Sequence, residues 1–258
     1  MRIATFNCNS VRARLDMVVA WLARHRPDIL GLQETKVVDE LFPVDAFRAA
    51  GYHVAYRGMK GYNGVALLSR EAPDDVSFGL RGRGPADEAR LLRARFGRLH
   101  VVNTYVPQGR AVDHAMFRYK VAWFRRLRRE FERDFSPRDA VVWLGDLNVA
   151  AEPADVHNPD DREQHVCYHA AARRAFARCR AWGFVDVFRR HHPEGGHYTF
   201  FDYRQVFSPA RRTGWRLDYI LATPGLANRS RDAWIDLEPR AGQRPSDHTV
   251  VAADFDVS

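Results

Sequence analysis

The sequence has few cysteines, almost no lysine and no long hydrophobic run, and each absence argues against a class of protein. The three cysteines, Cys8, Cys167 and Cys179, are an odd number without CxxC spacing, which favours buried thiols in a reducing compartment over a disulfide scaffold. No uninterrupted apolar run approaches the ~18 residues of a membrane span, and the first residues lack the apolar core of a signal peptide. We therefore expect a soluble cytoplasmic protein with no membrane partner.

Lysine is limited to Lys36, Lys60 and Lys120, so 37 of the 40 basic residues are arginine, a ratio that indicates biased coding composition. With 32 acidic residues, the formal net charge is +8. Compositional bias explains the choice of arginine over lysine better than it explains the excess of basic over acidic residues. The charge therefore favours a polyanionic partner such as nucleic acid.

Proline- or serine-rich tracts, fixed-period repeats and low-complexity blocks are missing as well, so nothing marks a domain boundary. The chain has 258 residues, of which 46% are hydrophobic, and a chain of this size can bury a large core. We expect one domain that spans residues 1–258, with a monomer as the default state.

The stretch 141–149 is an apolar run that ends in a carboxylate, Asp146, and an amide, Asn148. Side chains two residues apart point to the same side of an extended strand, so we expect these two together. Polar groups beside Val, Trp and Leu lose hydration unless they have partners, which favours a chemical role. The alternative is that Gly145 and Asp146 only turn the chain.

Other short apolar segments also end in isolated polar residues. The expected strands and their polar residues are 2–8 with Asn7, 29–32 with Glu34, and 99–106 with Tyr105. A tyrosine at a strand end is more often packing than catalysis, so both readings of Tyr105 stay open. Asp218 lies within the apolar run 214–221, where an unpaired buried charge is costly. His248, just before the expected last strand over 250–255, is its candidate partner.

Helical spacing and turn residues predict the remaining elements. The expected helices cover 11–25 after caps at Asn9 and Ser10, 117–135, and 168–182, where Gly183 ends the helix. Further strands are expected over 47–56, after a turn at Gly51, and over 65–69. The segment 73–89 is expected to be a surface loop or an irregular edge, and the segment 152–166 is expected to be a solvated loop.

Seven segments, in order along nearly the whole chain, resemble the exonuclease III/abasic-site endonuclease family, within the endonuclease/exonuclease/phosphatase superfamily. They are TFNCNS at 5–10, LQETK at 32–36, GYNGVA at 61–66, YVP at 105–107, GDLNV at 145–149, GWRLDY at 214–219 and SDH at 246–248. The resemblance implies a four-layer α/β sandwich in which two mixed β-sheets pack face to face with helices outside. One active site is then expected where the strand-end loops meet.

The resemblance also implies a metal site. Glu34, with Asn7 and Asp247 nearby, is expected to hold Mg²⁺, with Mn²⁺ as a substitute, because a hard cation suits a few oxygen ligands and several waters. The bound ion would neutralise phosphate charge. The number of metal ions stays open.

Five further residues take catalytic roles by the same resemblance. Asp146 is expected to accept a proton from the attacking water, and Asn148 to orient it. His248, held by Asp218, is expected to contact the phosphate and stabilise developing charge, and Tyr105 to add a phosphate or leaving-group contact. Whether the base is Asp146, Tyr105 or metal hydroxide stays open.

Substrate recognition is expected in two groups of residues. Phe200, Trp215 and Leu217 match positions that form an apolar pocket for a flipped-out sugar without its base, with ordinary core packing as the alternative. The expected phosphate contacts are Gln108, Lys36, Arg12, Arg14 and Arg110, and they are salt-dependent. The pair at 200–201 is Phe-Phe and departs from a Trp-containing dipeptide common among relatives, so the balance of exonuclease to abasic activity stays open.

The implied activity is that of a Mg²⁺-dependent phosphodiesterase of base excision repair. It is expected to cut double-stranded DNA 5′ to abasic sites and to remove 3′-blocking groups, with 3′→5′ exonuclease activity. One alternative keeps the fold and hydrolyses a phospholipid or inositol phosphate. The other is a non-catalytic nucleic-acid-binding relative, which would be expected to lack Glu34, Asp146 or His248, and all three are present.

Overall fold

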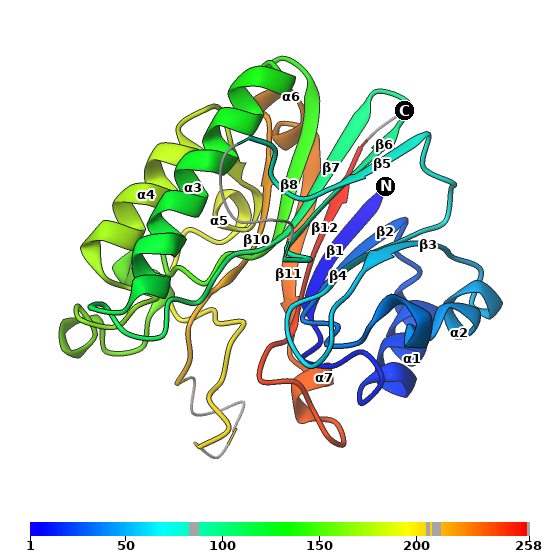
Figure 1. Cartoon of the computed structure of the whole chain (residues 1–258), viewed down its shortest axis with the longest axis horizontal. Coiled ribbons are helices and arrows are strands. Elements are labelled where there is room, and N and C mark those ends of the chain that lie inside the picture. The colour runs from blue at the N-terminus through cyan, green and yellow to red at the C-terminus, as the bar shows by residue number, and fades with distance from the viewer. Residues whose placement is uncertain (83–87, 205–206, 208–212, 257–258) are drawn as a thin grey trace.

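The computed structural model describes residues 1–82, 88–204, 207 and 213–256, and within them two six-stranded β-sheets pack face to face (Figure 1). Each sheet contains both parallel and antiparallel neighbours. Helices cover the two outer faces (Figure 1). The four-layer α/β sandwich expected from the sequence is confirmed. No helix in the described part of the chain combines the length and apolarity needed to cross a membrane.

The first sheet has the strand order β11-β12-β1-β2-β4-β3. Its strands are β1 (Arg2–Asn7), β2 (Ile29–Gln33), β3 (His53–Arg57), β4 (Val65–Ser69), β11 (Ser230–Asp236) and β12 (Val250–Phe255). Strands β1 and β2 are the parallel pair. The outer side carries α1 (Leu15–His25), η1 (Asp39–Leu41) and α2 (Val44–Ala49).

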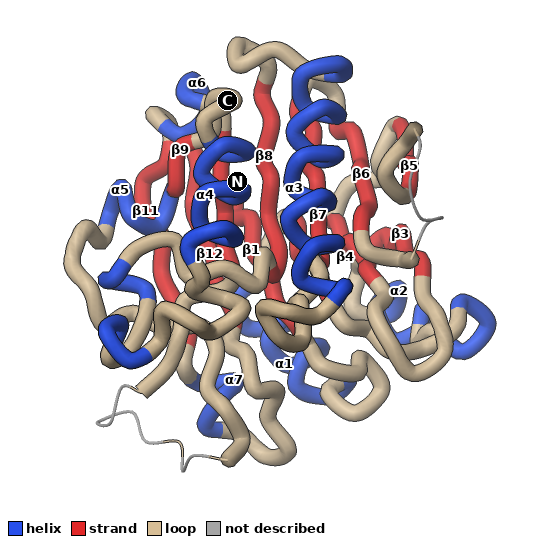
Figure 2. Tube along the Cα trace, turned by 60° about the vertical axis from the view of Figure 1, so that its left-hand side comes forward, coloured by secondary structure: helices blue, strands red, loops and turns tan. Residues whose placement is uncertain are grey.

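The second sheet has the order β5-β6-β7-β8-β10-β9. Its strands are β5 (Asp75–Phe78), β6 (Leu91–Phe96), β7 (Leu99–Tyr105), β8 (Ala140–Asp146), β9 (Val185–Asp186) and β10 (Asp218–Ala222). Helices α3 (Ala115–Asp134) and α4 (Ala170–Arg180) lie side by side on its outer face (Figure 2). The shorter helices are η2 (Pro153–Asp155), η3 (Pro159–Asp161), α5 (Val187–His191), α6 (Pro224–Ala227) and α7 (Glu238–Ala241).

Strand β8 shows why its sequence is a continuous apolar run. Val142 and Leu144 belong to the apolar core between the two sheets, whereas Val141 and Trp143 belong to the core beneath α3 and α4. Because both faces of the strand are covered, every position needs an apolar side chain. Polar residues can therefore appear only where the strand ends.

The strand register brings those polar ends to one edge of the sandwich. Asp146 at the end of β8 lies opposite Tyr105 of β7 and opposite Asp218 at the start of β10. In the other sheet, Asn7 lies opposite Gln33, the residue before Glu34. A slip of one residue would turn each side chain to the opposite face, so the register decides whether these groups meet.

The structure corrects the expected start of the first helix. Helix α1 begins at Leu15 with Arg14 as its N-cap, so Asn9 and Ser10 do not cap it. The amides of Ser10 and Val11 donate instead to the carbonyls of Glu34 and Thr35, which holds this stretch against the segment after β2.

Other local expectations were also wrong. The expected strand over 47–56 is helical as far as Ala49 and extended from His53, because Val44 and Phe47 are three residues apart and share one helical face. For 73–89 the surface-loop reading fails where β5 forms, whereas the alternative reading as an edge fits, because β5 is an edge strand of the second sheet; residues 83–87 lie outside the described part. Asp218 opens β10 rather than interrupting a strand that starts at residue 214. The loop over 152–166 is not solvated throughout, since Asp155 and Val166 are buried.

Arg216 explains how this loop is held. The residue is 1% exposed, and its guanidinium donates from Nε to Asp155 Oδ1 at 2.7 Å and from Nη2 to Asp186 Oδ2 at 2.7 Å. It also lies 4.3 Å from the centre of the Tyr219 ring. The buried pairings join the segment before β10 to η2 and β9.

We expect Arg216→Met to lower the free energy of unfolding by about 3–5 kcal/mol, because it removes the guanidinium that pairs with buried Asp186 and leaves buried Asp155 with Arg189 as its partner cation. Urea unfolding followed by circular dichroism measures the change. The control is Arg231→Met, which removes an ion pair whose side chains are 69% and 60% exposed, and should leave the midpoint unchanged. Equal effects in the two variants would contradict the structural role of Arg216.

Candidate active site

Five polar side chains from both sheets meet at the edge where the strands end: Asn7, Glu34, Asp146, Asp218 and His248. Asn7 Nδ2 donates to Glu34 Oε1 at 2.8 Å and to Asp146 Oδ2 at 2.9 Å, which joins the two sheets. His248 Nδ1 lies 2.7 Å from Asp218 Oδ2, so the expected aspartate–histidine pair is in place. The cluster is a connected hydrogen-bond network rather than a set of separate groups.

The backbone that presents these groups is in unusual conformations. Glu34 and Asn148 both have φ near 51°, in the left-handed region. Such a conformation costs a non-glycine residue about 1–3 kcal/mol and is concentrated at functional sites. Gly145 has φ 132°, and a Cβ there would collide with the carbonyl oxygen of Thr104. A glycine is therefore required immediately before Asp146.

Asp146 has the properties of a proton acceptor at neutral pH. Burial raises the pKa of its carboxyl to about 7, against the opposing effect of His248. Its Oδ1 accepts the backbone amide of Asn148 at 2.8 Å, and its Oδ2 accepts the side-chain amide of the same residue at 3.2 Å. A carboxylate held in this way and titrating near neutrality suits general base chemistry.

His248 has the complementary properties. Its burial alone lowers the pKa of the imidazole, but the carboxylates of Asp218 and Asp146 raise that pKa to about 10. Nδ1 is hydrogen-bonded to Asp218, and the ring lines a cavity together with Glu34. At neutral pH the ring is therefore a cation that can donate to an anion, and it has no lone pair for a metal ion.

The pKa values of Tyr105 and Glu34 are shifted in opposite directions. Burial raises the pKa of the Tyr105 hydroxyl well above its usual range, and the carboxylates of Glu34 and Asp146 raise it further. The phenol therefore stays protonated and acts as a hydrogen-bond donor rather than as a base. Burial also favours the neutral form of Glu34, but Lys36, with Nζ 2.7 Å from Oε2, acts together with Asn7 and His248 to lower the pKa of that carboxyl.

A divalent cation fits between the carboxylates. Ligand atoms of Glu34, Asp146 and His248 lie within 4.8 Å of one another. With His248 protonated, the remaining donors are carboxylate oxygens, which suit a hard cation that keeps several waters. The chemistry of the donor set therefore matches the expected metal at Glu34, with Asp146 beside it.

The two other residues expected at the metal lie close by but use their oxygens elsewhere. Asn7 turns its amide nitrogen to the carboxylates, and its Oδ1 accepts the amide of Asn9 at 3.1 Å. Asp247 Oδ1 accepts Asn9 Nδ2 at 2.9 Å. Asn9 therefore links Asn7 to Asp247 through its backbone amide and its side-chain amide.

A cavity of about 420 Å³ opens beside the cluster. Phe200, Trp215 and Leu217 line it together; Leu217 is buried and the two aromatic residues are half-buried. The Phe200 ring lies 5.0 Å from that of His248, so the apolar wall adjoins the cationic group. Among the described residues that line a larger cavity of about 600 Å³ beside α1 and α7, none belongs to the cluster.

The residues expected to contact phosphate do not all line the cavity. Gln108 lines the cavity. Lys36 is half-buried and paired with Glu34, so its charge is already partly used. Arg12 and Arg110 are exposed and lie outside the described cavity lining.

Sequence reasoning missed the contribution of the loop over 152–166. Arg162 and His165 from this loop line the cavity. The His165 ring lies 4.4 Å from that of Trp215, and burial lowers the pKa of His165 to about 4, so it packs as a neutral ring. The apolar pair Val166-Cys167 after an acidic stretch was the available signal that the loop returns to the core.

Lys120 was also missed. It is 0% exposed, and its Nζ donates to the carbonyls of Gln108 at 3.1 Å, Asn148 at 2.6 Å and Val166 at 2.9 Å. These carbonyls belong to the three loops that follow β7, β8 and η3. One buried ammonium thus fixes the relative positions of the loops around the cavity.

Comparisons with known proteins agree with this geometry. The model of the Endonuclease/Exonuclease/phosphatase family matches residues 4–248. Exodeoxyribonuclease III of Haemophilus influenzae is 33% identical over 267 residues, which cover 99% of this chain and 100% of that protein. An AP endonuclease from Archaeoglobus fulgidus is 50% identical with a TM-score of 0.97, and the 3′ phosphatase NExo from Neisseria, bound to a product DNA hairpin, is 41% identical with a TM-score of 0.93. Each of these two alignments covers 100% of both chains.

The charge state of His248 can be tested with Asp218→Asn. The carboxamide removes an attractive charge, so the pKa of His248 should fall from its raised value of about 10. The stability that comes from charging His248 is present in the wild type below pH 6.5 and is lost as the pH rises through about 10. Imidazole ¹⁵N NMR of the metal-free protein measures both titrations, with His248→Gln to assign the signal. Identical curves would contradict the pairing.

Proposed function

Because the chain belongs to the Endonuclease/Exonuclease/phosphatase family, we propose that it is a metal-dependent DNA repair phosphodiesterase. It cuts double-stranded DNA 5′ to abasic sites, removes 3′-blocking groups and has 3′→5′ exonuclease activity. The observation that carries the proposal is that His248 Nε2 lies 3.8 Å from Asp146 Oδ2 and that the His248 ring lines the cavity. The pKa of Asp146 is raised to about 7 and that of His248 to about 10, so a proton acceptor and a cation meet beside this cavity. The net charge of +8 supports a polyanionic substrate.

Asp146 is the general base in this proposal. It accepts a proton from the attacking water, and its pKa near neutrality matches that task. Asn148 holds both carboxylate oxygens and thereby orients them. Tyr105 is a poor candidate for the base, because its hydroxyl holds its proton well above pH 10.

His248 and Tyr105 act on the phosphate. The imidazolium, fixed at Nδ1 by Asp218, keeps Nε2–H to donate to a phosphate oxygen, where it stabilises the negative charge that develops during attack. The Tyr105 hydroxyl donates to a phosphate or leaving-group oxygen. His248 is buried and held by Asp218, and Tyr105 is half-buried with the Arg90 guanidinium 4.9 Å from its ring centre, so little reorganisation is required at the moment of reaction.

Mg²⁺ is the proposed ion, with Mn²⁺ as a substitute. Glu34 holds it, with Asp146 adjacent, and Asn7 and Asp247 lie within the surrounding hydrogen-bond network. When bound, the ion supplies charge neutralisation at the phosphate. The lowered pKa of Glu34 keeps that carboxylate ionised and ready for a cation.

The apolar wall supports an abasic nucleotide as the preferred target. Phe200, Trp215 and Leu217 suit a sugar without its base, and extruding an unpaired residue from a duplex costs little. A phosphoinositide offers no such apolar sugar face, although it shares the phosphoester. The aromatic wall and the basic charge together favour DNA over that alternative.

We further propose that residues 1–258 form a single catalytic domain that acts as a monomer. The family match to residues 4–248 supports one domain, and one chain supplies every residue of the site described above. The three buried, unpaired cysteines support a reducing, cytoplasmic location.

The activity is tested on a duplex oligonucleotide with one central abasic site. We expect incision 5′ to the site with Mg²⁺, none with EDTA, and a rate about 10²–10⁴-fold lower for Asp146→Asn, because an amide cannot accept the proton. The control is Asp75→Asn, an exposed carboxylate on β5, which should cleave at the wild-type rate. An intact duplex, together with hydrolysis of a phosphoinositide, would show that the proposed substrate is wrong.

The pocket is tested with Trp215→Ala. Loss of the indole should lower kcat/KM for abasic incision by about 10- to 150-fold, since burying one aromatic side chain contributes about 1.5–3 kcal/mol. The kcat/KM for removal of a 3′-phosphate at a nick should fall less, because this reaction needs no extruded sugar in the pocket. Trp234→Ala on β11, half-buried and away from the cavity, is the matched control. Equal losses on both substrates would mean that Trp215 supports the fold rather than substrate choice.

A further inference from the structure

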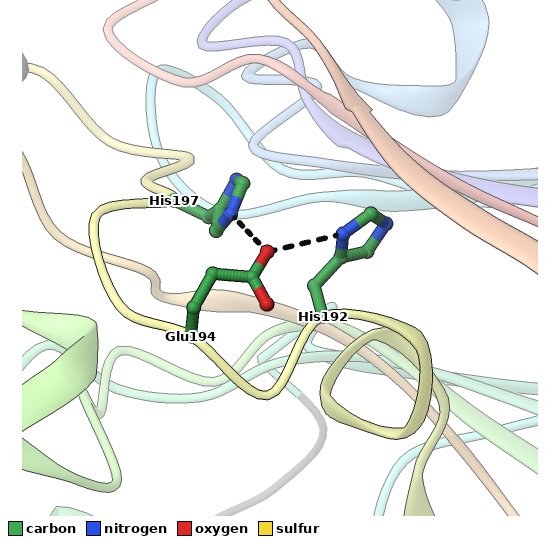
Figure 3. A group of neighbouring side chains, drawn as sticks. All are labelled: His192, Glu194 and His197. Atoms are coloured by element: carbon green, nitrogen blue, oxygen red, sulfur yellow. Dashed lines mark hydrogen bonds and ion pairs between the residues drawn. The ribbon is translucent and has the colours of Figure 1, made fainter.

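A second group of metal-ligating side chains lies outside the active site. His192, Glu194 and His197 stand on the turn that follows α5, and their ligand atoms lie within 4.8 Å of one another. Figure 3 shows both imidazoles directed at the same carboxylate: His192 Nδ1 is 3.4 Å and His197 Nε2 is 2.8 Å from Glu194 Oε1. The three residues therefore converge on one point from a single short turn.

The hydrogen bond on the far side of His192 decides what that point can hold. Nε2 of His192 lies 2.7 Å from the carbonyl oxygen of Ala233, and a carbonyl can only accept, so Nε2 carries a hydrogen. A neutral ring then turns the lone pair of Nδ1 toward a carboxylate oxygen. Two acceptors facing each other need a cation between them. A backbone carbonyl that orients a histidine in this way is the usual outer partner of a metal ligand.

The surroundings hold both rings in position. Phe188 stacks on His192 with ring centres 4.7 Å apart and meets His197 edge-on at 5.4 Å. Arg189 donates to the backbone carbonyls of His192 and Glu194, which fixes the turn and leaves the Glu194 carboxylate free to ligate. The side chains of His192 and His197 are 32% and 25% exposed, so an ion can reach them from solvent.

A third group of potential ligands, His25, Asp236 and Glu238, lacks these features. Trp21 Nε1 donates to Asp236 at 2.8 Å, and Arg24 pairs with Glu238, so both carboxylates are already engaged. In the part of the chain that the structure describes, the Glu194 carboxylate pairs with no basic side chain other than the two imidazoles.

We propose that His192 Nδ1, His197 Nε2 and a Glu194 oxygen form a binding site for a transition-metal ion of the Zn²⁺ class, with water as the fourth ligand. Two imidazoles and one carboxylate are a ligand set that Zn²⁺ accepts, whereas Mg²⁺ prefers oxygen. Zn–N and Zn–O bonds of about 2.1 Å place neighbouring ligand atoms about 3.4 Å apart. The His192 contact already has that length, and the His197 contact opens to it by movement of Glu194, whose side chain is 58% exposed.

The site is distinct from the catalytic centre, and the proposal does not depend on nuclease activity. It does connect to the cavity through the chain: the turn runs directly into residues 198–200, and Phe200 lines the cavity. A bound ion fixes the turn from which this aromatic wall begins.

The test measures Zn²⁺ binding by the full-length chain. The parent is Glu34→Gln in excess Mg²⁺, which removes the catalytic carboxylate as a competing ligand. After incubation with Zn²⁺ and desalting, elemental analysis should find one bound Zn²⁺ per chain in the parent. The double variant His192→Gln/His197→Gln in the same background should lose it, and His191→Gln, a neighbouring histidine that contacts Ser230, should keep it.

Thermal unfolding gives an independent measurement. Zn²⁺ should raise the unfolding midpoint of the parent and of His191→Gln, but not that of the double variant, because an ion that binds only the folded chain stabilises it. Circular dichroism without Zn²⁺ verifies that all variants are folded. A parent that retains no Zn²⁺, or a double variant that retains as much as the parent, would overturn the proposal and leave a proton as the cation between these groups.

Discussion

Negative charge concentrated between two apolar sheets is the constraint on which the rest of this structure depends. Asp146 and Asp218 are almost fully buried, and Glu34 stands beside them. Three carboxylates at one buried edge are tolerated only because His248 is positively charged and Asn7 donates to two of them. Burial, with the repulsion that remains, raises the pKa of Asp146 to about 7, and the neighbouring carboxylates keep His248 charged. Acid and base properties thus follow from a single arrangement of charges.

That arrangement requires the two sheets to be aligned, and a buried amide network between them supplies the alignment. Asn103 of β7 donates across the interface to the carbonyls of Leu32 at 3.0 Å and Ala66 at 2.8 Å, and its Oδ1 accepts Gln33 Nε2 at 2.7 Å. Apolar side chains alone would permit small sliding movements, but hydrogen bonds in a dry core hold one position. Gln33 is the residue before Glu34, so the same hydrogen bonds also fix the position of the Glu34 backbone relative to the second sheet.

The sequence predicted the strand-end residues well, because their signal is local: an apolar strand, covered on both faces, that ends in a polar group. The motif at Asp146 follows from that rule. The pairing of Asp218 with His248 follows from the cost of an unpaired charge in an apolar run, and the resemblance supplied the layers. Interactions between distant segments could not be read in this way. Arg216 gives no local sign that its partners lie on η2 and β9, and Lys120 reads as part of a solvated helix face although it is buried. Element boundaries failed where a backbone partner, such as the segment after β2, overrode helical spacing.

Loops rather than strands complete the cavity, and buried cations hold those loops. Lys120 gathers carbonyls from three of them, Arg216 joins the segment of Trp215 to two carboxylates, and Arg189 holds the backbone of the turn after α5. Buried backbone carbonyls need hydrogen-bond donors. In these loops, cationic side chains supply donors that the backbone amides of a helix or sheet would otherwise supply. Because a carbonyl is the same whatever side chain its residue carries, the loop sequences are free to differ while the loop positions are maintained. The proposed roles of the aromatic wall in substrate preference and of the histidine turn in cation binding are therefore compatible with a fixed arrangement of the polar groups at the strand ends.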